Sequence, residues 1–478
     1  MPTQNVSKQK FLQKSTVQRK SQKTQKINHR GRWLWFGFGL SGVAMLSATA
    51  GALLAVSLST TPLMQSKLSD AEAAIFADGN LAESNLRLPR LTRPVNILIL
   101  GTKVLTSDLE EEVNSDSGYH ETLNSVEGLS DVLLLVRFNP ETNKLIPLSI
   151  PRDTRTLIEG HGVKKINDAN RNGGPALAAK TVSELLGGLR IDRYIRINVF
   201  GVEKLVDALG GVDLYVPHDM KYQDDSQHLY INLKEGQQHL DGSQALQFLR
   251  FRNDKLGDIG RIQRQQLLMR ALIDQNLNLN AITRLPNLLS VVKDHIDTNL
   301  SIEEIGALAG FGAQIEHQDV EMLMIPGDFN DPKKYDASYW MPNYEAIDAM
   351  MAQHFDYDKH SAGYQDIDPT SLRVAIQDST DDWYGVDELI RSLGDKGYWN
   401  VYNSDPWKEP LEVTRIVAQK GDVASAQAIR DDLGFGEVLV ESTGSLRSDI
   451  TIQLGQDWLK MQQEIEQQQI DGEWETSW

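Results

Sequence analysis

The chain has 478 residues, of which 40% are hydrophobic and 24% are charged, with 36 glycines and 16 prolines. This is the composition of a globular protein of two or three domains, which excludes a collagen-like or wholly disordered chain. The chain contains no cysteine, so disulfide bonds, thiolate nucleophiles and cysteine-based metal sites are also excluded.

The net charge of −18 is divided unevenly along the chain. Residues 1–32 contain nine lysines or arginines and no acid, so this tail of +9 leaves −27 for the remaining residues. An acidic body repels the phosphates of nucleic acid, and only the short tail has the opposite charge. We therefore expect no nucleic-acid partner.

Residues 33–57 are predicted to form one transmembrane helix. No charged residue occurs from Trp33 to Ser66, and the apolar run exceeds the ~20 residues that span a bilayer. The positive-inside rule places residues 1–32 in the cytoplasm and the bulk of the chain outside, as a single-pass protein of the cell membrane. The alternative is a cleaved signal peptide, because Ala48-Thr49-Ala50 has the form of a cleavage site, although cleavage there would cut the apolar run midway.

After a linker at 58–93, strands and helices alternate through a predicted larger domain at 94–345. Short apolar runs predict strands, and runs of helical periodicity closed by Gly-Gly predict helices. The strands are expected at 96–100, 132–136, 145–150, 194–199, 212–216 and 322–325, and the helices at 175–186, 202–209, within 240–275 and within 283–312. This alternation predicts an α/β fold, a layered sandwich with a mixed central sheet and helices on both faces.

A second, smaller domain is predicted at 371–458, after a linker at 346–370. Two β-α-β units with one extra strand fit within about 85 residues. The strands are expected at 372–376, 400–402, 415–418, 438–440 and 451–454, and the helices at 384–393 and 423–433. This arrangement predicts a ferredoxin-like α/β sandwich. The polar tail at 459–478 is expected to be a solvated helix or disordered.

Arginines form the main candidate site. Arg250, Arg252, Arg261 and Arg264 lie close together in an otherwise acidic chain, the last two on a helix that begins after Asp258. Guanidinium groups bind phosphate oxygens in pairs, and a helix N-terminus adds partial positive charge. The alternative is that Arg261 and Arg264 are solvated helix positions paired with acids.

Two further candidates lie at the ends of strands. Arg152 directly follows the strand that ends at Pro151, and strand ends are where sheet-based sites collect their ligands. Asp153 is expected either to orient Arg152 or to cap a turn. Asp131, just before another strand, is a candidate ligand for a divalent ion, or else an ordinary residue at a strand start.

The ordered motifs resemble the LytR-CpsA-Psr family of membrane-anchored bacterial cell-wall proteins. The resemblance covers about residues 95–275, and residues 371–458 resemble the LytR C-terminal domain. The motifs are Asn96–Gly101, Ser130-Asp131, Ser149–Thr154, Lys165-Ile166-Asn167, Gly173-Gly174-Pro175, Ile191–Tyr194, Val206–Val212 and Leu240–Gln265.

The resemblance implies a phosphotransferase that moves a glycopolymer from a polyprenyl-pyrophosphate carrier to peptidoglycan with the help of Mg²⁺. By position, Arg152, Arg250, Arg252, Arg261 and Arg264 would hold the pyrophosphate. Asp131 would hold the metal, and Asp258 would act as base or orient the metal. An apolar channel between the sheet and the helices would hold the isoprenoid tail.

The sequence departs from the family pattern in two places. Lys103 stands where the family usually has Asp, and Leu129 stands where it usually has Arg. Loss of one metal-associated carboxylate weakens the case for Mg²⁺, and Lys103 could replace part of the metal's charge on the phosphates. The acidic stretch 108–121 could supply a substitute carboxylate, or it is a solvated loop.

Two other functions remain open from the sequence. The same arginines could serve a phosphatase that cleaves polyprenyl pyrophosphates with water as acceptor. Alternatively, the chain could be a regulator that binds the lipid pyrophosphate or the cell wall without turnover, with Lys103 marking the loss of catalysis.

Overall fold

The computed structural model describes residues 65–77, 79–83, 89–102, 128–225, 229–251, 258–276, 288, 291, 293, 295–335, 337–356 and 369–464, with backbone only at 258, 276 and 383. These residues belong to one compact unit, Pro62–Trp478. Within these ranges no helix has the length and apolar character needed to cross a bilayer. The predicted tail at 1–32 and transmembrane helix at 33–57 lie outside the described residues.

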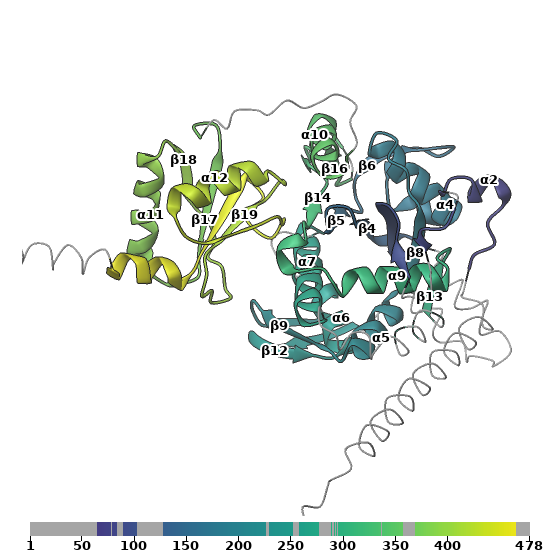
Figure 1. The fold of residues 1–478 in the computed structure, drawn as a ribbon, viewed down its shortest axis with the longest axis horizontal. Coiled ribbons are helices and arrows are strands. Elements are labelled where there is room, and N and C mark those ends of the chain that lie inside the picture. The colour runs from purple at the N-terminus through teal and green to yellow at the C-terminus, as the bar shows by residue number, and fades with distance from the viewer. Residues whose placement is uncertain are drawn as a thin grey trace, which may run out of the picture. The chain divides into compact units, whose positions relative to one another are not determined.

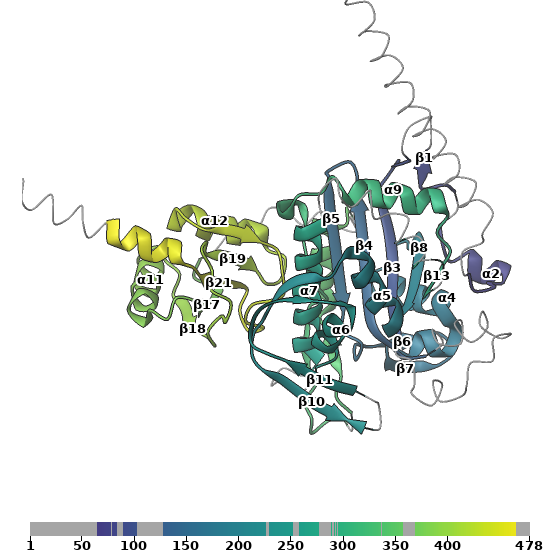
Figure 2. The ribbon, with the colours of Figure 1, turned by 90° about the horizontal axis from the view of Figure 1, so that it is seen from below.

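A six-stranded mixed sheet forms the centre of the first domain (Figure 1). In spatial order its strands are β13 (Ile296–Thr298), β8 (Arg193–Asn198), β3 (Val95–Thr102), β4 (Ser130–Asn139), β5 (Lys144–Ile150) and β14 (Leu323–Met324). Strand β3 runs parallel to β8 and antiparallel to β4, and β5 runs antiparallel to β4 and parallel to β14. Figure 2 shows β5, β4, β3 and β8 side by side. The mixed central sheet expected from the sequence is confirmed.

Helices cover both faces of this sheet because apolar side chains alternate along its strands. Leu98 and Leu100 point to one face, where they share a core with helix α4 (Asp168–Leu185). Ile97 points to the other face and packs in a cluster with helix α9 (Ile302–Gly312). The layered α/β sandwich is therefore confirmed.

Helices α4, α5 and α6 were all predicted, and α4 and α5 begin earlier than expected. Helix α4 begins before the predicted Pro175, and Gly174, at φ +62°, interrupts it just ahead of that proline. Helix α5 (Val199–Leu209) ends at Gly210, whose φ of +88° suits a residue without a side chain. Helix α6 (Gly242–Arg250) is capped by Asp241, as predicted, through a reciprocal pair of hydrogen bonds with Gln244.

Two small antiparallel ribbons form a separate layer that the sequence analysis assigned only in part. Strand β9 pairs with β12, and β10 pairs with β11. These strands are β9 (Val212–Val216), β10 (Met220–Asp224), β11 (Leu229–Leu233) and β12 (Gly236–Leu240). Their inward side chains form one apolar cluster with α5, α6 and the long helix α7 (Asp258–Asn276).

Residues 344–354 form helix α10 (Tyr344–His354), although the sequence predicted a linker beginning at 346. Asn343 caps the helix, and Ile347, Met350 and Met351 are buried at helical spacing. The apolar residues therefore hold the segment on the domain despite its Tyr/Asp/Pro-rich surroundings. The remaining short elements are α2 (Asp70–Ala73), β1 (Ala82–Glu83), β2 (Arg90–Leu91), β6 (Arg155–Ile158), β7 (Gly162–Lys165), η3 (His317–Asp319), β15 (Gly327–Phe329) and β16 (Trp340–Pro342).

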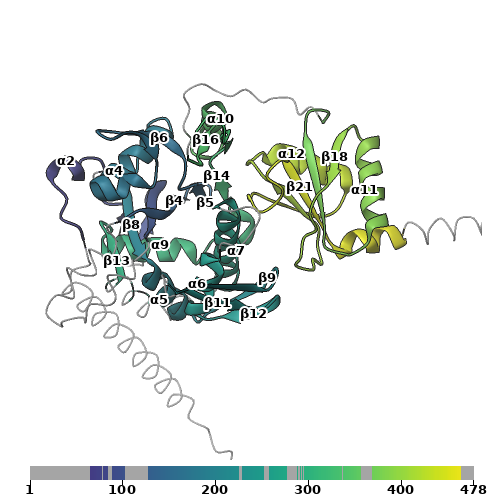
Figure 3. The same ribbon diagram turned by 180° about the vertical axis from the view of Figure 1, so that it is seen from behind.

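The second domain is a five-stranded sheet in the order β18-β17-β21-β19-β20 (Figure 3). Its elements are β17 (Arg373–Asp378), α11 (Trp383–Asp395), β18 (Asn400–Asn403), β19 (Arg415–Ala418), α12 (Val423–Leu433), β20 (Glu437–Leu439) and β21 (Ile450–Leu454), followed by helical residues 456–464. The two strands of each β-α-β unit are direct neighbours, whereas a ferredoxin-like sheet interleaves them. The ferredoxin-like prediction is therefore wrong. Strand β21, buried at every position, takes the centre of the sheet between the two units.

Helix α7 contacts the second domain through buried polar groups. Ser442 N–H donates to Gln266 Oε1 at 2.9 Å. One turn further along, Arg270 forms an ion pair with Glu441, and both side chains are more than nine-tenths buried. A buried charge that loses its partner is strongly destabilising, so this pair fixes α7 to the loop that follows β20.

Glu441→Gln is expected to destabilise the chain by about 3–5 kcal/mol, because it leaves the Arg270 charge buried without its ion-pair partner. Chemical denaturation of the full chain measures this. The matched control is Glu412→Gln, whose exposed partner is Lys460 at 3.4 Å, and which is expected to cost less than about 1 kcal/mol. Equal effects of the two substitutions would contradict the buried-pair account.

The stability of the C-terminal sheet in acid depends on the carboxylate of Asp449. Asp449 accepts hydrogen bonds from Arg373 at 3.0 Å and Lys420 at 2.8 Å. Burial raises the pKa of Asp449, but these hydrogen bonds outweigh burial and bring it to about 2. A carboxyl group with a lowered pKa stabilises the fold above its ordinary pKa of 3.8, and this stabilisation is lost as the pH falls toward about 2.

The difference in denaturation midpoint between the wild type and Asp449→Asn should therefore be constant above pH 3.8 and shrink below it. Urea denaturation at a series of pH values measures this difference. A difference that is the same across this range would contradict the role assigned to the carboxylate.

Candidate functional site

Asp131 and Arg152 meet at one end of the central sheet. Leu133 of β4 pairs with Ile150 of β5, so continuing that register brings Asp131 opposite Arg152. Arg152 Nη1 donates to Asp131 Oδ1 at 2.6 Å, and each side chain is 23% exposed. This pair is therefore ordered by the sheet and still open to a ligand.

Asp131 occupies a β-bulge. Val132 pairs with Gly101 of β3, but Ser130 pairs with Thr102, so Asp131 is the extra residue between them. Bulges re-aim side chains and are common beside functional sites. Gly101 allows the strands to approach here, since a Cβ at this position would lie 2.8 Å from Val132 Cβ.

Backbone hydrogen bonds hold three of the sequence motifs together around this pair. Asn167 N–H donates to the carbonyl of Arg152 at 3.2 Å, and the Asn167 carbonyl accepts from Ser130 N–H at 3.3 Å. Ile166 N–H donates to the Thr154 carbonyl at 2.8 Å. The segment around 165–167 therefore fixes both the start of β4 and the turn that carries Arg152.

Helix α7 supplies a second guanidinium group. Arg261 Nη1 lies 3.9 Å from Asp131 Oδ1, and the Arg261 residue is only 8% exposed. Asp153 is also close, with Oδ1 3.9 Å from Arg152 Nε and 3.0 Å from Lys165 Nζ. Two arginines around one carboxylate give a site with excess positive charge, which suits an anion with several oxygens.

The other predicted arginines are placed differently. Arg264 is 5% exposed, donates through Nη2 to the Phe251 carbonyl, and has its guanidinium carbon 5.8 Å from the centre of the Phe251 ring. It thus fixes the chain just after α6. Arg250 is the last residue of α6 and is half-buried.

Lys103, Arg252 and the side chain of Asp258 lie outside the described residues. Of the residues predicted to hold the pyrophosphate or the metal, the structure brings Asp131, Arg152 and Arg261 together, with Asp153 beside Arg152.

A buried polar network, which the sequence did not predict, connects to the loop just before Asp131. Arg196 Nε donates to Asp297 Oδ2 at 2.6 Å, and both side chains are almost fully buried. Arg196 Nη1 also lies 3.4 Å from Asn170 Oδ1, and Asn170 Nδ2 donates to the Gly128 carbonyl at 2.9 Å. The network therefore supports the loop just before Asp131. The sequence signal that could have revealed this network is Arg196, a charged residue inside an apolar strand, because a buried charge needs a partner.

The metal and channel predictions are not tested by this geometry. In the part of the chain that the structure describes, no three or more His, Asp or Glu side chains are grouped closely enough to hold a metal ion. Asp131 supplies one carboxylate, already bound to Arg152. Two cavities outlined by the described residues are lined by neither Asp131 nor Arg152, and the apolar channel stays a prediction.

Comparisons with known proteins confirm the family resemblance that the sequence motifs predicted. A model of the LytR_cpsA_psr family matches residues 60–356, and one for the LytR cell envelope-related transcriptional attenuator matches residues 371–458. The chain is 34% identical over 243 residues to the polyisoprenyl-teichoic acid–peptidoglycan teichoic acid transferase TagU of Bacillus cereus, covering 50% of this chain and 70% of that protein.

The chain is similarly 32% identical over 240 residues to the transferase TagV of Bacillus subtilis, covering 48% of this chain and 61% of that protein. The crystal structure of B. subtilis TagV is 28% identical and covers 56% of this chain and 98% of its own, with a TM-score of 0.45.

Asp131→Asn is expected to tighten binding of inorganic pyrophosphate when divalent ions are chelated. The carboxylate competes with the anion for Arg152 and Arg261, and removing one such charge at a partly exposed site is worth on the order of 1 kcal/mol, or about fivefold in Kd. Isothermal titration measures this, with Asp219→Asn, from an exposed pair with Lys234, as a control that leaves Kd unchanged. Weaker binding by Asp131→Asn under these conditions would contradict the competition.

Proposed function

The chain belongs to the LytR-CpsA-Psr family, and from this premise we propose that it transfers a glycopolymer from a polyprenyl-pyrophosphate carrier to peptidoglycan at the outer face of the cytoplasmic membrane. It is a glycopolymer transferase of that family. The observation that supports the proposal best is the pair of guanidinium groups, from Arg152 and Arg261, beside Asp131.

The reaction in this proposal is a phosphoryl transfer. A hydroxyl oxygen of peptidoglycan attacks the phosphorus that carries the glycan. The bond from that phosphorus to the bridging oxygen breaks, so polyprenyl phosphate leaves and a phosphodiester joins glycan to peptidoglycan. The hydroxyl proton goes to a base, for which Asp258 is the candidate.

In this scheme the arginines contribute most of the catalysis, by aligning the substrate and neutralising its charge. Phosphoryl transfer needs alignment and charge neutralisation more than covalent help from the protein. Arg152, on a sheet-anchored turn, and Arg261, on a buried helix face, are held in place before the substrate arrives. Arg250, Arg252 and Lys103 complete the proposed pyrophosphate site, and Arg264, which the sequence also assigned to it, holds the chain at Phe251.

Mg²⁺ is part of the proposal as a partner of Asp131. Magnesium is commonly held by one or two carboxylates together with substrate phosphates and water, which a single aspartate beside a diphosphate satisfies. When bound, the ion would neutralise phosphate charge. Asp131 would then exchange its contact with Arg152 for the metal, and Arg152 would turn to the phosphate.

Membrane attachment through residues 33–57, with residues 1–32 in the cytoplasm, completes the proposal. Its support is the uncharged run from Trp33 to Ser66 beside a tail with nine cations. Tethering raises the effective concentration of the enzyme at a lipid-linked donor. The donor also brings its own driving force, because a pyrophosphate bond is broken in the transfer.

Arg152→Ala is expected to lower transfer by about 10²–10³-fold, as loss of a preorganised charge at a reacting group does elsewhere, while the protein stays folded. The assay follows a labelled glycan from polyprenyl pyrophosphate to peptidoglycan fragments. Arg171→Ala, which removes an exposed arginine paired with Asp168, serves as the control with unchanged activity. Transfer by Arg152→Ala at the wild-type rate would contradict the proposal.

Product analysis in the same assay separates transfer from hydrolysis. Transfer predicts the phosphodiester whenever peptidoglycan fragments are present. Free glycan phosphate as the sole product in their presence would instead establish the phosphatase, and donor binding without any product would establish the non-catalytic regulator.

A further inference from the structure

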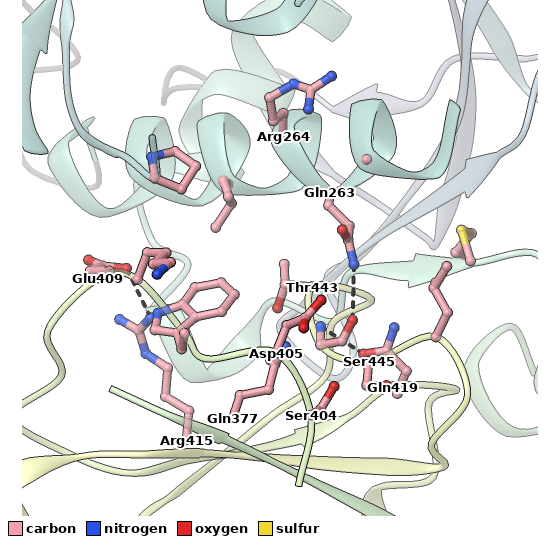
Figure 4. Close-up of a pocket in the computed structure, with 18 of the residues that line it drawn as sticks. Gln263, Arg264, Gln377, Ser404, Asp405, Glu409, Arg415, Gln419, Thr443 and Ser445 are labelled. Atoms are coloured by element: carbon pink, nitrogen blue, oxygen red, sulfur yellow. Dashed lines mark hydrogen bonds and ion pairs between the residues drawn. The ribbon is translucent and has the colours of Figure 1, made fainter. Parts of the chain in front are cut away.

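A cavity of about 1520 Å³ lies along α7, on the side of that helix that faces the second domain. Its walls come from α7, the β15–β16 ribbon, strand β9 and the second domain (Figure 4). Sites for single small molecules usually measure about 300–1,000 Å³, so this one has room for a chain of several rings.

The walls of the cavity are held in place by hydrogen bonds across it. Gln263 Nε2 donates to the carbonyls of Gly444 at 3.0 Å and Ser442 at 3.2 Å. Figure 4 shows Gln263 pointing from α7 toward the loop that carries Thr443 and Ser445. Together with the Arg270–Glu441 pair, these contacts make the cavity a fixed feature of the two domains.

Two uncharged nitrogen donors on the cavity wall are buried and find no acceptor among the described residues. Gln419 is 4% exposed, and its Oε1 accepts from Gly444 N–H at 2.9 Å, which fixes the amide orientation. Its Nε2 is buried without a hydrogen-bond partner in the described part of the chain, and the same holds for the indole Nε1 of Trp407. Buried donors are normally satisfied, so these two point to a ligand that offers acceptor oxygens.

Aromatic rings and uncharged polar groups make up much of the remaining wall. Phe329 is 53% exposed, unusual for a phenylalanine, and packs edge-on against Trp340 with 5.4 Å between ring centres. Tyr402 and Gln377 line the same cavity. Rings that stack on the C–H face of a sugar, beside amides that bind its hydroxyl and acetamido groups, are the chemistry of a carbohydrate site.

Several of the cations on the wall pair with neighbouring acids. Arg373 and Lys420 both pair with Asp449, and Arg415 pairs with Glu409 at 3.4 Å. A polyanion would have to break such pairs to bind. The cavity therefore favours an uncharged glycan over a phosphate-rich polymer.

The cavity lies along the helix that also supplies Arg261 to the arginine site. Gly260 and Gln263 line it, and they flank Arg261 on α7, whose guanidinium lies 3.9 Å from the Asp131 carboxylate. A glycan in the cavity would therefore lie against the same helix that carries Arg261, although Arg261 itself does not line the cavity.

We propose that this cavity binds the acceptor of the transfer, an uncharged N-acetylated amino-sugar strand. Trp407 and Gln419 donate to its acetamido or hydroxyl oxygens, and Phe329 stacks on a sugar ring. The inference rests on the proposed function for the identity of the acceptor. It gives the second domain a part in that function, as one wall of the acceptor site.

The test is titration of the full chain with a hexamer of β-1,4-linked N-acetylglucosamine. Trp407→Phe keeps a ring but removes the N–H donor, and Gln419→Met keeps the volume but removes the amide. Each is expected to weaken binding about fivefold, as loss of one hydrogen bond does, and to raise KM for peptidoglycan fragments with kcat unchanged. Trp399→Phe, at a site that is 74% exposed and not part of the cavity wall, should bind like the wild type.

Three outcomes overturn the inference: no binding of the hexamer, equal effects of Trp407→Phe and Trp399→Phe, or displacement of the hexamer by polyglycerol phosphate. None of these touches the proposed function, which Arg152→Ala tests separately. In turn, Arg152→Ala should bind the hexamer normally while losing transfer.

Discussion

The contact between Arg152 and Asp131 is the interaction on which the site depends. The antiparallel register of β4 and β5 brings the two residues opposite each other. The β-bulge after Gly101 determines the direction in which the Asp131 side chain points. The backbone contacts of Asn167 then hold both ends of the pair. The turn that carries Arg152 is thus held at the site, so its guanidinium group needs only to exchange Asp131 for an incoming phosphate, and charge placed in advance in this way is what phosphoryl transfer requires.

Much of the fold could be predicted because its strands are short apolar runs with clear ends. Strand β3 and its neighbours follow that pattern, and Asp241 marks the start of α6 through its cap. Strand β11 was missed although its side chains alternate between buried and exposed, since the surrounding sequence is polar. The order of the C-terminal strands was wrong because local pattern does not encode which strand β21 will pair with.

The site was predictable in composition but not in geometry. Arg152 and Arg261 are far apart in sequence, and their meeting at Asp131 depends on strand pairing and on the packing of α7. Arg264 lies one turn beyond Arg261 yet supports Phe251, because successive turns of a buried helix face different neighbours. The Arg196–Asp297 pair could not be predicted because its two residues belong to different strands. Only the pairing register of β8 with β13 places them next to each other.

The most direct measurement is a crystal structure of the chain with inorganic pyrophosphate bound. In that structure, diphosphate oxygens should lie within hydrogen-bond distance of the Arg152 and Arg261 guanidinium groups, and Arg152 should have turned away from Asp131. A diphosphate bound elsewhere, with the Arg152–Asp131 contact unchanged, would contradict this assignment of the site.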